Sequence, residues 1–243
     1  TLGNLAVAAG VTTVDFSAIT KTNYSTTTTL EDITNNSTTN VTGGAGADTI
    51  VMKAEHLTSA DTINGGSGID ILQFSTQASG IASSAFGGVS NVEILKIGNF
   101  ASQSIALGDA SFTTIDATAL TSTNSVSIDF SGATSDKNIT VKTSVSGTGA
   151  DTVTMKTADF TSADVIELGA GTADKLVLST VATNVAATAF TNVSGVEVLE
   201  LKATTGAQNV TLGAGFTTVD ASAATAAAVT IDGAATSSLN LSK

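Results

Sequence analysis

The sequence predicts an all-β fold, a right-handed parallel β-solenoid, from three observations. First, glycine-rich nonapeptides recur at residues 43–51 (GGAGADTIV) and 65–73 (GGSGIDILQ). Second, short β-branched or alanine-rich stretches alternate with Gly, Thr, Ser, Asn and Asp, which is the pattern of many short strands. Third, a longer unit repeats along the chain, as it does in solenoids. No long segment has the 3.6-residue apolar period that would predict a helix.

Each nonapeptide predicts a tight turn followed by a short strand. Glycine reaches backbone conformations that are closed to residues with a Cβ, so Gly43, Gly44 and Gly46 predict the turn. The large apolar residue at the eighth position, Ile50 in the first copy, begins a strand that points into the core. Residues 56–64 (HLTSADTIN) have lost the glycines but keep the aspartate and the apolar residue in frame. We therefore expect them to form a half-coil on the opposite side.

The longer unit has about a hundred residues. Asp48 corresponds to Asp151 at an offset of 103 residues, and Asp116 corresponds to Asp220 at an offset of 104. The chain starts without Met and inside a repeat, so we expect it to be a fragment of a longer protein. The predicted organisation is one continuous solenoid, with the tail of a preceding repeat at 1–42, a first unit at 43–144 and a second unit at 145–243.

Within a unit, many apolar centres lie 9 to 13 residues apart, the length of a turn plus a short strand. The largest gaps, residues 75–91 and 179–195, are rich in small residues and hold one phenylalanine each, Phe86 and Phe190. There we expect a loop or short helix that caps one side of the solenoid. The main rival fold is a pair of antiparallel sandwich domains. The predicted strand centres are Ile50, Ile63, Leu72, Leu95, Ile105, Ile115, Ile128 and Ile139.

Composition limits the partners. The chain has 21 acidic residues against nine lysines, with no arginine, and a net charge of −12. This argues against a nucleic-acid partner, because phosphate binding needs a basic face. It fits a surface that collects divalent cations, although solubility alone would also explain it. Cysteine is absent, so no disulfide stabilises the fold. The sequence shows neither an apolar run long enough to cross a membrane nor a signal peptide at its start.

The sequence does not predict a catalytic centre. The one histidine, His56, corresponds to Asp159 in the second unit, and a single histidine cannot make a zinc site. No G-x-S-x-G or H-E-x-x-H element is present. Polysaccharide lyases with β-helices use Lys or Arg beside clustered acids, and this chain has no Arg. The Thr pairs are too irregular for the flat ranks of an ice-binding solenoid. We therefore expect a non-enzyme.

The glycine turns are the candidate metal sites. A tight glycine turn can aim carbonyl oxygens inward, and the aspartate adds a carboxylate; calcium takes six to eight such oxygens. One turn cannot supply them all, so the ion should lie between stacked turns. Loops 146–151 and 169–174 are degraded copies, with Ser146 in place of a glycine. The candidate ligand residues are Gly43, Gly44, Ala45, Gly46, Asp48, Asp61, Gly65, Gly66, Ser67, Gly68, Asp70, Gly147, Gly149, Asp151, Asp164, Gly169, Gly171 and Asp174.

A second group of aspartates follows apolar residues in strand-like stretches. Each carboxylate is either a further ligand at a coil corner or a group that ends a strand by bonding turn amides. The sequence leaves both interpretations open. The group consists of Asp15, Asp116, Asp129, Asp220 and Asp232.

The nonapeptides 43–51 and 65–73 match G-G-x-G-x-D-x-U-x, so the chain resembles RTX proteins, whose repeats form a calcium-binding β-roll. The resemblance implies RTX-type calcium-binding turns in the predicted solenoid (β-roll or β-helix), with calcium as the cofactor. The alternation of these loops with strands such as NVEILKI and FTTVDASA is similar to Gram-negative surface-layer proteins exported by the type I route. That likeness implies calcium-driven folding outside the cell and self-association into a lattice.

Two functions follow from the resemblance. The first is a structural, calcium-dependent protein of the bacterial surface layer, with a possible contact to cell-surface polysaccharide elsewhere in the full-length chain. The second is the non-catalytic RTX region of a type I-secreted adhesin, toxin or hydrolase. Both imply an extracellular location. A catalytic motif upstream would favour the second, and further copies of the hundred-residue unit would favour the first.

Overall fold

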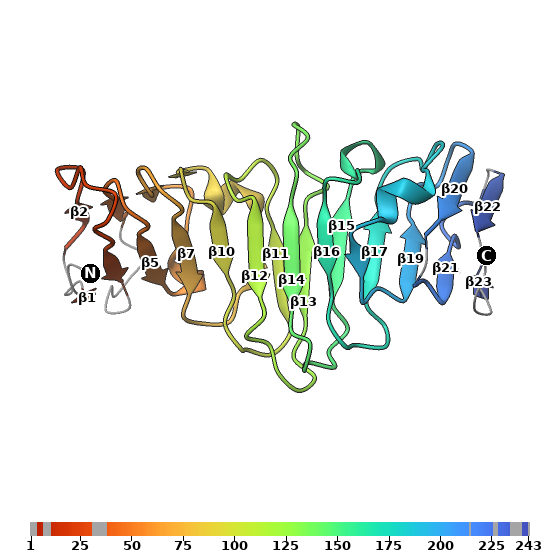
Figure 1. Cartoon of the computed structure of the whole chain (residues 1–243), viewed down its shortest axis with the longest axis horizontal. Helices are drawn as coiled ribbons and strands as arrows, with labels where there is room; N and C mark the ends of the chain where they lie inside the picture. Colours follow the sequence, from red (N-terminus) through yellow and green to blue (C-terminus); the bar gives the residue numbers. More distant parts are fainter. Residues whose placement is uncertain are drawn as a thin grey trace.

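The computed structural model describes residues 4–6, 11–30, 38–213, 215–225, 228–233 and 240–242 of the 243-residue chain. They form a parallel β-solenoid of about nine coils with almost no helix. The molecule is elongated along the solenoid axis, with β1 near one end and β23 near the other (Figure 1). The strand pairs of the described residues are all parallel. The predicted solenoid is confirmed, and the antiparallel sandwich is excluded.

The coils build two opposite faces, and each face is divided into two sheets. Sheet A comprises β1 (Asn4–Ala6), β3 (Thr27–Thr29), β5 (Thr49–Met52), β7 (Ile71–Phe74), β10 (Ile94–Lys96), β12 (Thr114–Ala117), β14 (Thr140–Thr143), β16 (Val165–Glu167) and β18 (Val193–Ser194). The two-stranded sheet D, β20 (Gln208–Leu212) and β22 (Val229–Gly233), continues this face.

The opposite face begins with the four-stranded sheet B: β2 (Thr13–Asp15), β4 (Asn40–Thr42), β6 (Thr62–Asn64) and β9 (Val89–Ser90). Sheet C continues it with β8 (Ser79–Ile81), β11 (Gln103–Ala106), β13 (Val126–Asp129), β15 (Thr152–Met155), β17 (Lys175–Leu178), β19 (Val198–Leu201), β21 (Thr218–Asp220) and β23 (Asn240–Ser242).

The core is a set of stacked apolar side chains between the two faces. In sheet A, Ile50 lies in register with Leu72 and Leu72 with Leu95, and all three are at most 1% exposed. Residues on either side of each centre point outward, because successive side chains of a strand alternate between its faces. Most predicted centres occupy this position. Ile139 is an exception: it is buried, but it precedes β14, where Val141 takes the place in the stack.

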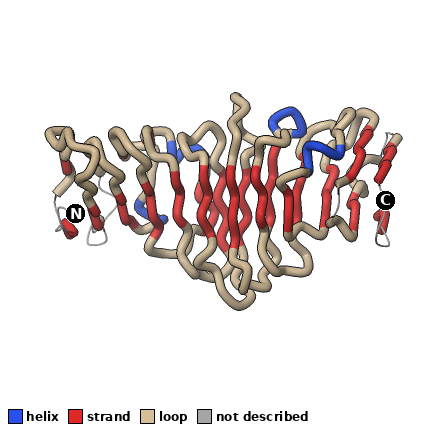
Figure 2. Tube along the Cα trace, viewed as in Figure 1, coloured by secondary structure: helices blue, strands red, loops and turns tan. Residues whose placement is uncertain are grey.

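Each of the long alanine- and serine-rich segments contributes one phenylalanine to a cluster of aromatic rings in the core. The segments contain the 3₁₀ helices η2 (Ser83–Phe86) and η4 (Ala187–Phe190), which place Phe86 and Phe190 in the core at 3% and 4% exposure. The expected loop or short helix with an inserted phenylalanine is therefore present. Figure 2 shows the helices in the connections between strands; the other two are η1 (Ala54–His56) and η3 (Thr157–Asp159). The ring contacts are Phe74–Phe86–Phe112 and Phe160–Phe190–Phe216.

Equivalent strands of the two units lie on opposite faces. β5, which follows Asp48, belongs to sheet A, whereas β15, which follows Asp151, belongs to sheet C. Along sheet A the order β5-β7-β10-β12-β14 spans four coils, and β15 follows half a coil later on the other face. The offset of 103 residues thus corresponds to four and a half coils. A surface feature repeated in the sequence alternates between the two sides of the solenoid.

No helix within the described part of the chain is long and apolar enough to span a membrane.

Candidate functional site

Two of the predicted glycine turns stack directly on each other. Turns 43–48 and 65–70 both lead from sheet B into sheet A, so they lie on the same edge of the solenoid. The Ser67 amide donates to the Gly44 carbonyl at 2.9 Å, and the Gly43 amide donates to the Asn64 carbonyl at 2.8 Å. Residues 91–93 form the next turn, whose strand neighbour Ser90 accepts from the Gly65 amide. We call these three stacked turns the first row.

The glycines are required by this stacking. A Cβ on Gly43 would lie 1.9 Å from the Gly65 carbonyl oxygen, and one on Gly65 would lie 2.0 Å from the Asn91 oxygen. Gly66 and Gly68 also have φ values of +97° and +130°, which residues with a side chain rarely adopt. The glycines of the motif therefore serve coil stacking, independently of any role in metal binding.

The acidic side chains of the first row form a hydrogen-bonded ladder across the coils. The Asp48 amide donates to Oδ1 of Asp70 at 2.6 Å, and the Asp70 amide donates to Oε2 of Glu93 at 2.9 Å. At the start of the row, Oδ1 of Asp48 accepts from the amide and the hydroxyl of Thr26 at 2.5 and 2.8 Å. Oδ2 of Asp48 accepts from the Gly44 amide at 2.7 Å. Each carboxylate thus bonds an amide of the preceding coil.

A second row with the same ladder lies on the opposite edge, where the chain passes from sheet A into sheet C. Oδ1 of Asp151 accepts from the Val126 amide at 2.8 Å. The Asp151 amide donates to Oδ1 of Asp174 at 2.7 Å, and the Asp174 amide donates to Oε2 of Glu197 at 3.0 Å. The degraded glycine pattern of the second unit therefore still forms the stacked turn.

Glycines of the second row meet the same restriction. A Cβ on Gly149 would lie 2.1 Å from the Asn124 oxygen, and one on Gly169 would lie 2.1 Å from the Ser144 oxygen. A Cβ on Gly171 would lie 2.4 Å from Oδ2 of Asp174. Gly147 differs, because its nearest neighbour would lie 3.5 Å away. Replacement of the first motif glycine by Ser146 is tolerated because Ser146 is exposed.

Asp70 and Asp174 are the strongest candidate ligands. Both residues are 0% exposed, and in each the Oδ2 atom is buried without a hydrogen-bond partner. Burial raises the pKa of Asp70 to about 6, and the charges of Asp48 and Glu93 act in the same direction. Burial likewise raises the pKa of Asp174 to about 6, assisted by the charges of Asp151 and Glu197 and opposed by the Asp151 and Gly171 amides near its carboxylate. A buried anionic oxygen without a donor is costly, and a hard cation bonded to it would remove that cost.

A cation at the rows would need ligands other than a cluster of acidic side chains. Within the described residues, no three His, Cys, Asp or Glu side chains come together in a metal-binding cluster. A cation at Asp70 would therefore take most of its ligands from main-chain carbonyls of turns 43–47 and 65–69. Calcium accepts such a set of carbonyl and carboxylate oxygens. At Asp174 the corresponding turns are 146–150 and 169–173.

Asp61 and Asp164 fit a metal less well, although sequence reasoning grouped them with the other candidates. In Asp61, Oδ1 accepts from the Thr39 amide at 2.7 Å and Oδ2 accepts from the Thr58 amide at 2.7 Å. In Asp164, the Ile139 and Thr161 amides do the same at 2.9 and 2.8 Å. Each carboxylate joins two segments of backbone, so both of its oxygens already have donors. This arrangement favours a structural role.

Four of the five corner aspartates bond the amide two residues further on; for Asp232 that position lies outside the described residues. Oδ1 of Asp15 accepts from Ser17, and Oδ1 of Asp129 accepts from Ser131 at 2.7 Å. Asp116 and Asp220 make the equivalent bonds to Thr118 and Ser222. Of the two interpretations left open by the sequence, the geometry favours the carboxylate that closes a turn.

Glu93 and Glu197, which end the two ladders, were not among the predicted site residues. A signal for them existed: both follow the row aspartate by 23 residues, and the two units share this glutamate in NVEILKI and GVEVLEL. The preceding turn residues share a conformation too, since Asn91 and Gly195 have φ values of +50° and +64°.

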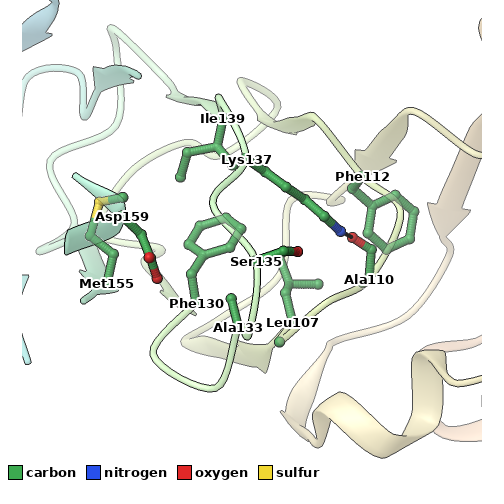
Figure 3. Close-up of a pocket in the computed structure, with 11 residues that line it drawn as sticks. Leu107, Ala110, Phe112, Phe130, Ala133, Ser135, Lys137, Ile139, Met155 and Asp159 are labelled. Carbon is green, nitrogen blue, oxygen red and sulfur yellow. Dashed lines mark hydrogen bonds between the residues drawn. The ribbon is translucent and has the colours of Figure 1, made fainter. Parts of the chain in front are cut away.

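One further cavity lies between the loops that follow β11 and β13 (Figure 3). Its lining is mainly apolar and includes Phe112, Phe130 and Met155. Lys137 crosses it and donates to the Asp109 and Ala110 carbonyls at 2.8 and 2.6 Å, which anchors the longer loop. The cavity volume of about 20 Å³ has room for about one water molecule. It is a gap under a loop and is too small for an organic ligand.

No protein-family model matches the chain, and searches of curated proteins and of solved structures gave no match.

Proposed function

We propose that this chain is a calcium-dependent structural segment of a bacterial cell-surface protein that assembles into a surface-layer lattice. The observation that carries the proposal is the match between Asp70 and Asp174. Each lies at the middle of a stacked glycine-turn row, each is fully buried, and each has an Oδ2 atom without a donor. A structural explanation accounts for the glycines and for Oδ1 of both residues, but it leaves these two oxygens unpaired.

Calcium would supply the positive charge that the rows lack. The carboxylates of Asp48, Asp70 and Glu93 are linked through successive coils, and no lysine forms an ion pair with any of them in the described part of the chain. The chain's own residues hold the turns in register and exclude water from Asp70. Because the charged rows oppose stacking without a cation, calcium binding and folding would be coupled.

This coupling suits a protein that folds after export. Extracellular calcium-binding modules commonly have dissociation constants of about 10⁻⁴–10⁻³ M, far above cytosolic calcium. With a net charge of −12, the chain would remain loosely structured before type I export and would fold at the cell surface. Self-association of the folded solenoids would then build the lattice.

A calcium titration followed by circular dichroism tests the metal. We expect β-structure to form with added calcium and to be lost in excess chelator. The D70N/D174N variant should raise the midpoint calcium concentration by about tenfold or more, equivalent to about 1.4 kcal/mol of binding free energy. The control D129N makes the same type of substitution at a corner aspartate that bonds Ser131, and it should leave the midpoint unchanged. A wild-type chain equally folded and stable in chelator would refute the proposed calcium dependence.

Electron microscopy of the full-length protein tests the lattice. We expect ordered two-dimensional arrays in calcium and their loss in chelator. If calcium drives folding but no array forms, the chain is instead the non-catalytic region of an exported adhesin, toxin or hydrolase.

A further inference from the structure

Four charged side chains alternate in sign along the outer surface of sheet A. Lys96 of β10 is in register with Asp116 of β12, Asp116 with Lys142 of β14, and Lys142 with Glu167 of β16. All four are partly exposed and alternate with buried core residues along their strands. We call this set the charge ladder.

A second column of outward-facing residues runs beside the charge ladder. It consists of β-branched side chains in the same registers: Ile94, Thr114, Thr140 and Val165. All of them are partly exposed. The loops at both edges extend beyond the strand ends in the plane of the sheets, so they do not cover this region in the view of Figure 1. The face thus offers a stripe of compact apolar and hydroxyl-bearing side chains flanked by charges.

The order of charges makes this face complementary to itself. Consider a second copy related by a twofold axis that is parallel to the strands and passes between β12 and β14. The operation exchanges β10 with β16 and β12 with β14, at the same height along the strands. Lys96 then faces Glu167 of the copy, and Asp116 faces Lys142 of the copy. Ile94 faces Val165 of the copy in the neighbouring column. An isologous contact needs this kind of match.

The opposite face has no such property. Along sheet C the charged residues of the matching column are Asp129, Glu200 and Asp220, all acidic. The half-coil offset explains the contrast, because Glu200 is the repeat equivalent of Lys96 and lies on the other face. The column contains no lysine, although Lys175 in the neighbouring column pairs with Glu200 at 2.7 Å. Two copies of sheet C therefore cannot match opposite charges along this column as sheet A can.

The charge ladder is only partly satisfied within one chain. Lys142 and Glu167 form an ion pair at 2.9 Å, but their side chains remain 44% and 46% exposed. Asp116 uses Oδ1 for the Thr118 amide and hydroxyl. Lys96 is in no ion pair with any residue that the structure describes. Lys96 therefore lies on the strand next to Asp116 with no ion pair of its own among the described residues.

We propose that sheet A binds a second copy of the chain face to face, with the two solenoids antiparallel and the charge ladders opposed. Neighbouring strands lie about 4.8 Å apart, so the four ladder strands cover about 15 Å of the axis. The contact is smaller than the standard interface of about 800 Å² per partner. A single pair is therefore weak, and repetition across an array strengthens it. The inference deepens the self-association in the proposed function and rests on it.

A charge-swap mixture tests the pairing. In calcium and at low ionic strength, sedimentation equilibrium should show weak wild-type dimers. In a K96E homodimer two carboxylates oppose each other at both outer contacts, and in an E167K homodimer two ammonium groups do so. Each variant alone should therefore associate at least about tenfold more weakly. An equimolar mixture of the two restores opposite charges at both contacts, so it should form heterodimers. If the mixture associates no better than either variant, the charge ladder acts only within one chain and the proposal is wrong.

Cysteine cross-linking tests the register. The chain contains no cysteine, so each introduced thiol is unique. Under mild oxidation, T114C mixed with T140C should give more disulfide-linked dimer than either variant alone. The control pair is S104C and S127C, which lie in register on neighbouring strands of sheet C. A mixture of these two variants should give only a background yield of disulfide-linked dimer. Equal yields from both pairs would overturn the proposed face. These outcomes are separate from the calcium test, because a chain that folds without calcium can still pair through sheet A, and a calcium-dependent chain can fail to do so.

Discussion

The amide of Asp48 donates a 2.6 Å hydrogen bond to the carboxylate of Asp70, one coil further along the chain. The row aspartate therefore has a structural function that does not involve metal: it fixes the register between successive turns. Asp151 and Asp174 repeat the relationship at 2.7 Å on the opposite edge. Oδ1 of Asp70 and of Asp174 accepts an amide of the coil before it, and the buried Oδ2 of each has no hydrogen-bond partner.

The contact between glycine and the next coil leads to the first prediction. We expect Gly65→Ala to destabilise the calcium-bound chain by about 1–3 kcal/mol, because the added methyl group would lie 2.0 Å from the Asn91 carbonyl oxygen and overpack the turn. Urea unfolding in saturating calcium measures the change.

Gly132→Ala is the control for this substitution. The added Cβ would lie 3.8 Å from its nearest neighbour, and Gly132 does not have a left-handed backbone conformation. Its effect should stay within about 0.5 kcal/mol. Equal effects at Gly65 and Gly132 would contradict the close stacking of the turns.

Glu93 provides the second prediction. Its Oε2 accepts the Asp70 amide at 2.9 Å and ends the ladder. Glu93→Ala leaves that amide without its acceptor and should cost about 1–3 kcal/mol. Glu93→Gln keeps an acceptor oxygen and removes a charge that raises the Asp70 pKa, so it should cost less in calcium-free buffer. Chemical denaturation of both variants in chelator tests this order. Both variants remove the charge, so a greater loss for the glutamine variant would contradict a stabilising role for the acceptor oxygen.

The solenoid was predictable because its information is local and repeated. A turn glycine, an aspartate and an apolar centre recur at the coil spacing, so the stacking of Ile50 on Leu72 follows from a 22-residue shift. The exception at Ile139 has a local cause. The loop before β14 is longer. Ile139 and Val141 are both buried, Ile139 just before the strand and Val141 within it, so Val141 takes the place in the stack.

The different functions of similar aspartates were not predictable from the sequence. Asp61 and Asp70 occupy the same position in the nonapeptide frame, but only Asp61 finds an amide donor for each oxygen. The difference depends on the turn before each residue: before Asp61, the places of the motif glycines are taken by His56, Leu57 and Ser59, and the Thr58 amide reaches Oδ2. The edge of the solenoid on which each row lies could not be predicted either. It depends on whether the 103-residue offset makes an integral number of coils.

The third prediction concerns the inserted phenylalanines. Phe86 is 3% exposed and contacts Phe74 and Phe112 with ring centroids 6.4 and 5.5 Å away. Phe86→Ala should cost about 3–5 kcal/mol, because it removes a buried ring and leaves a cavity. Tyr24→Ala is the control, since Tyr24 is 40% exposed, and it should cost much less. Urea denaturation compares them; similar losses would mean that η2 does not anchor the long segment.

The last prediction concerns the stability of the calcium-free chain as a function of pH. Burial raises the pKa values of Asp70 and Asp174 from 3.8 to about 6 in the folded state. Between these values the folded chain binds more protons than the unfolded chain, so its free energy of unfolding should fall as the pH rises from about 4 to 6. Above that window both carboxylates are charged and the destabilisation is complete. In D70N/D174N this part of the pH dependence should disappear.

Asp109→Asn serves as the control in the same buffers. Its hydrogen bonds with Thr134 lower the pKa of Asp109 to about 2, so the stabilisation that it provides is lost only as the pH falls below about 4. The variant should shift the curve between pH 4 and 7 without changing its slope. Thermal or urea unfolding in chelator across this range gives the slopes. Parallel curves for the wild-type chain and D70N/D174N would show that the two carboxylates do not titrate in this window, and the argument for a cation at their unpaired oxygens would lose its electrostatic support.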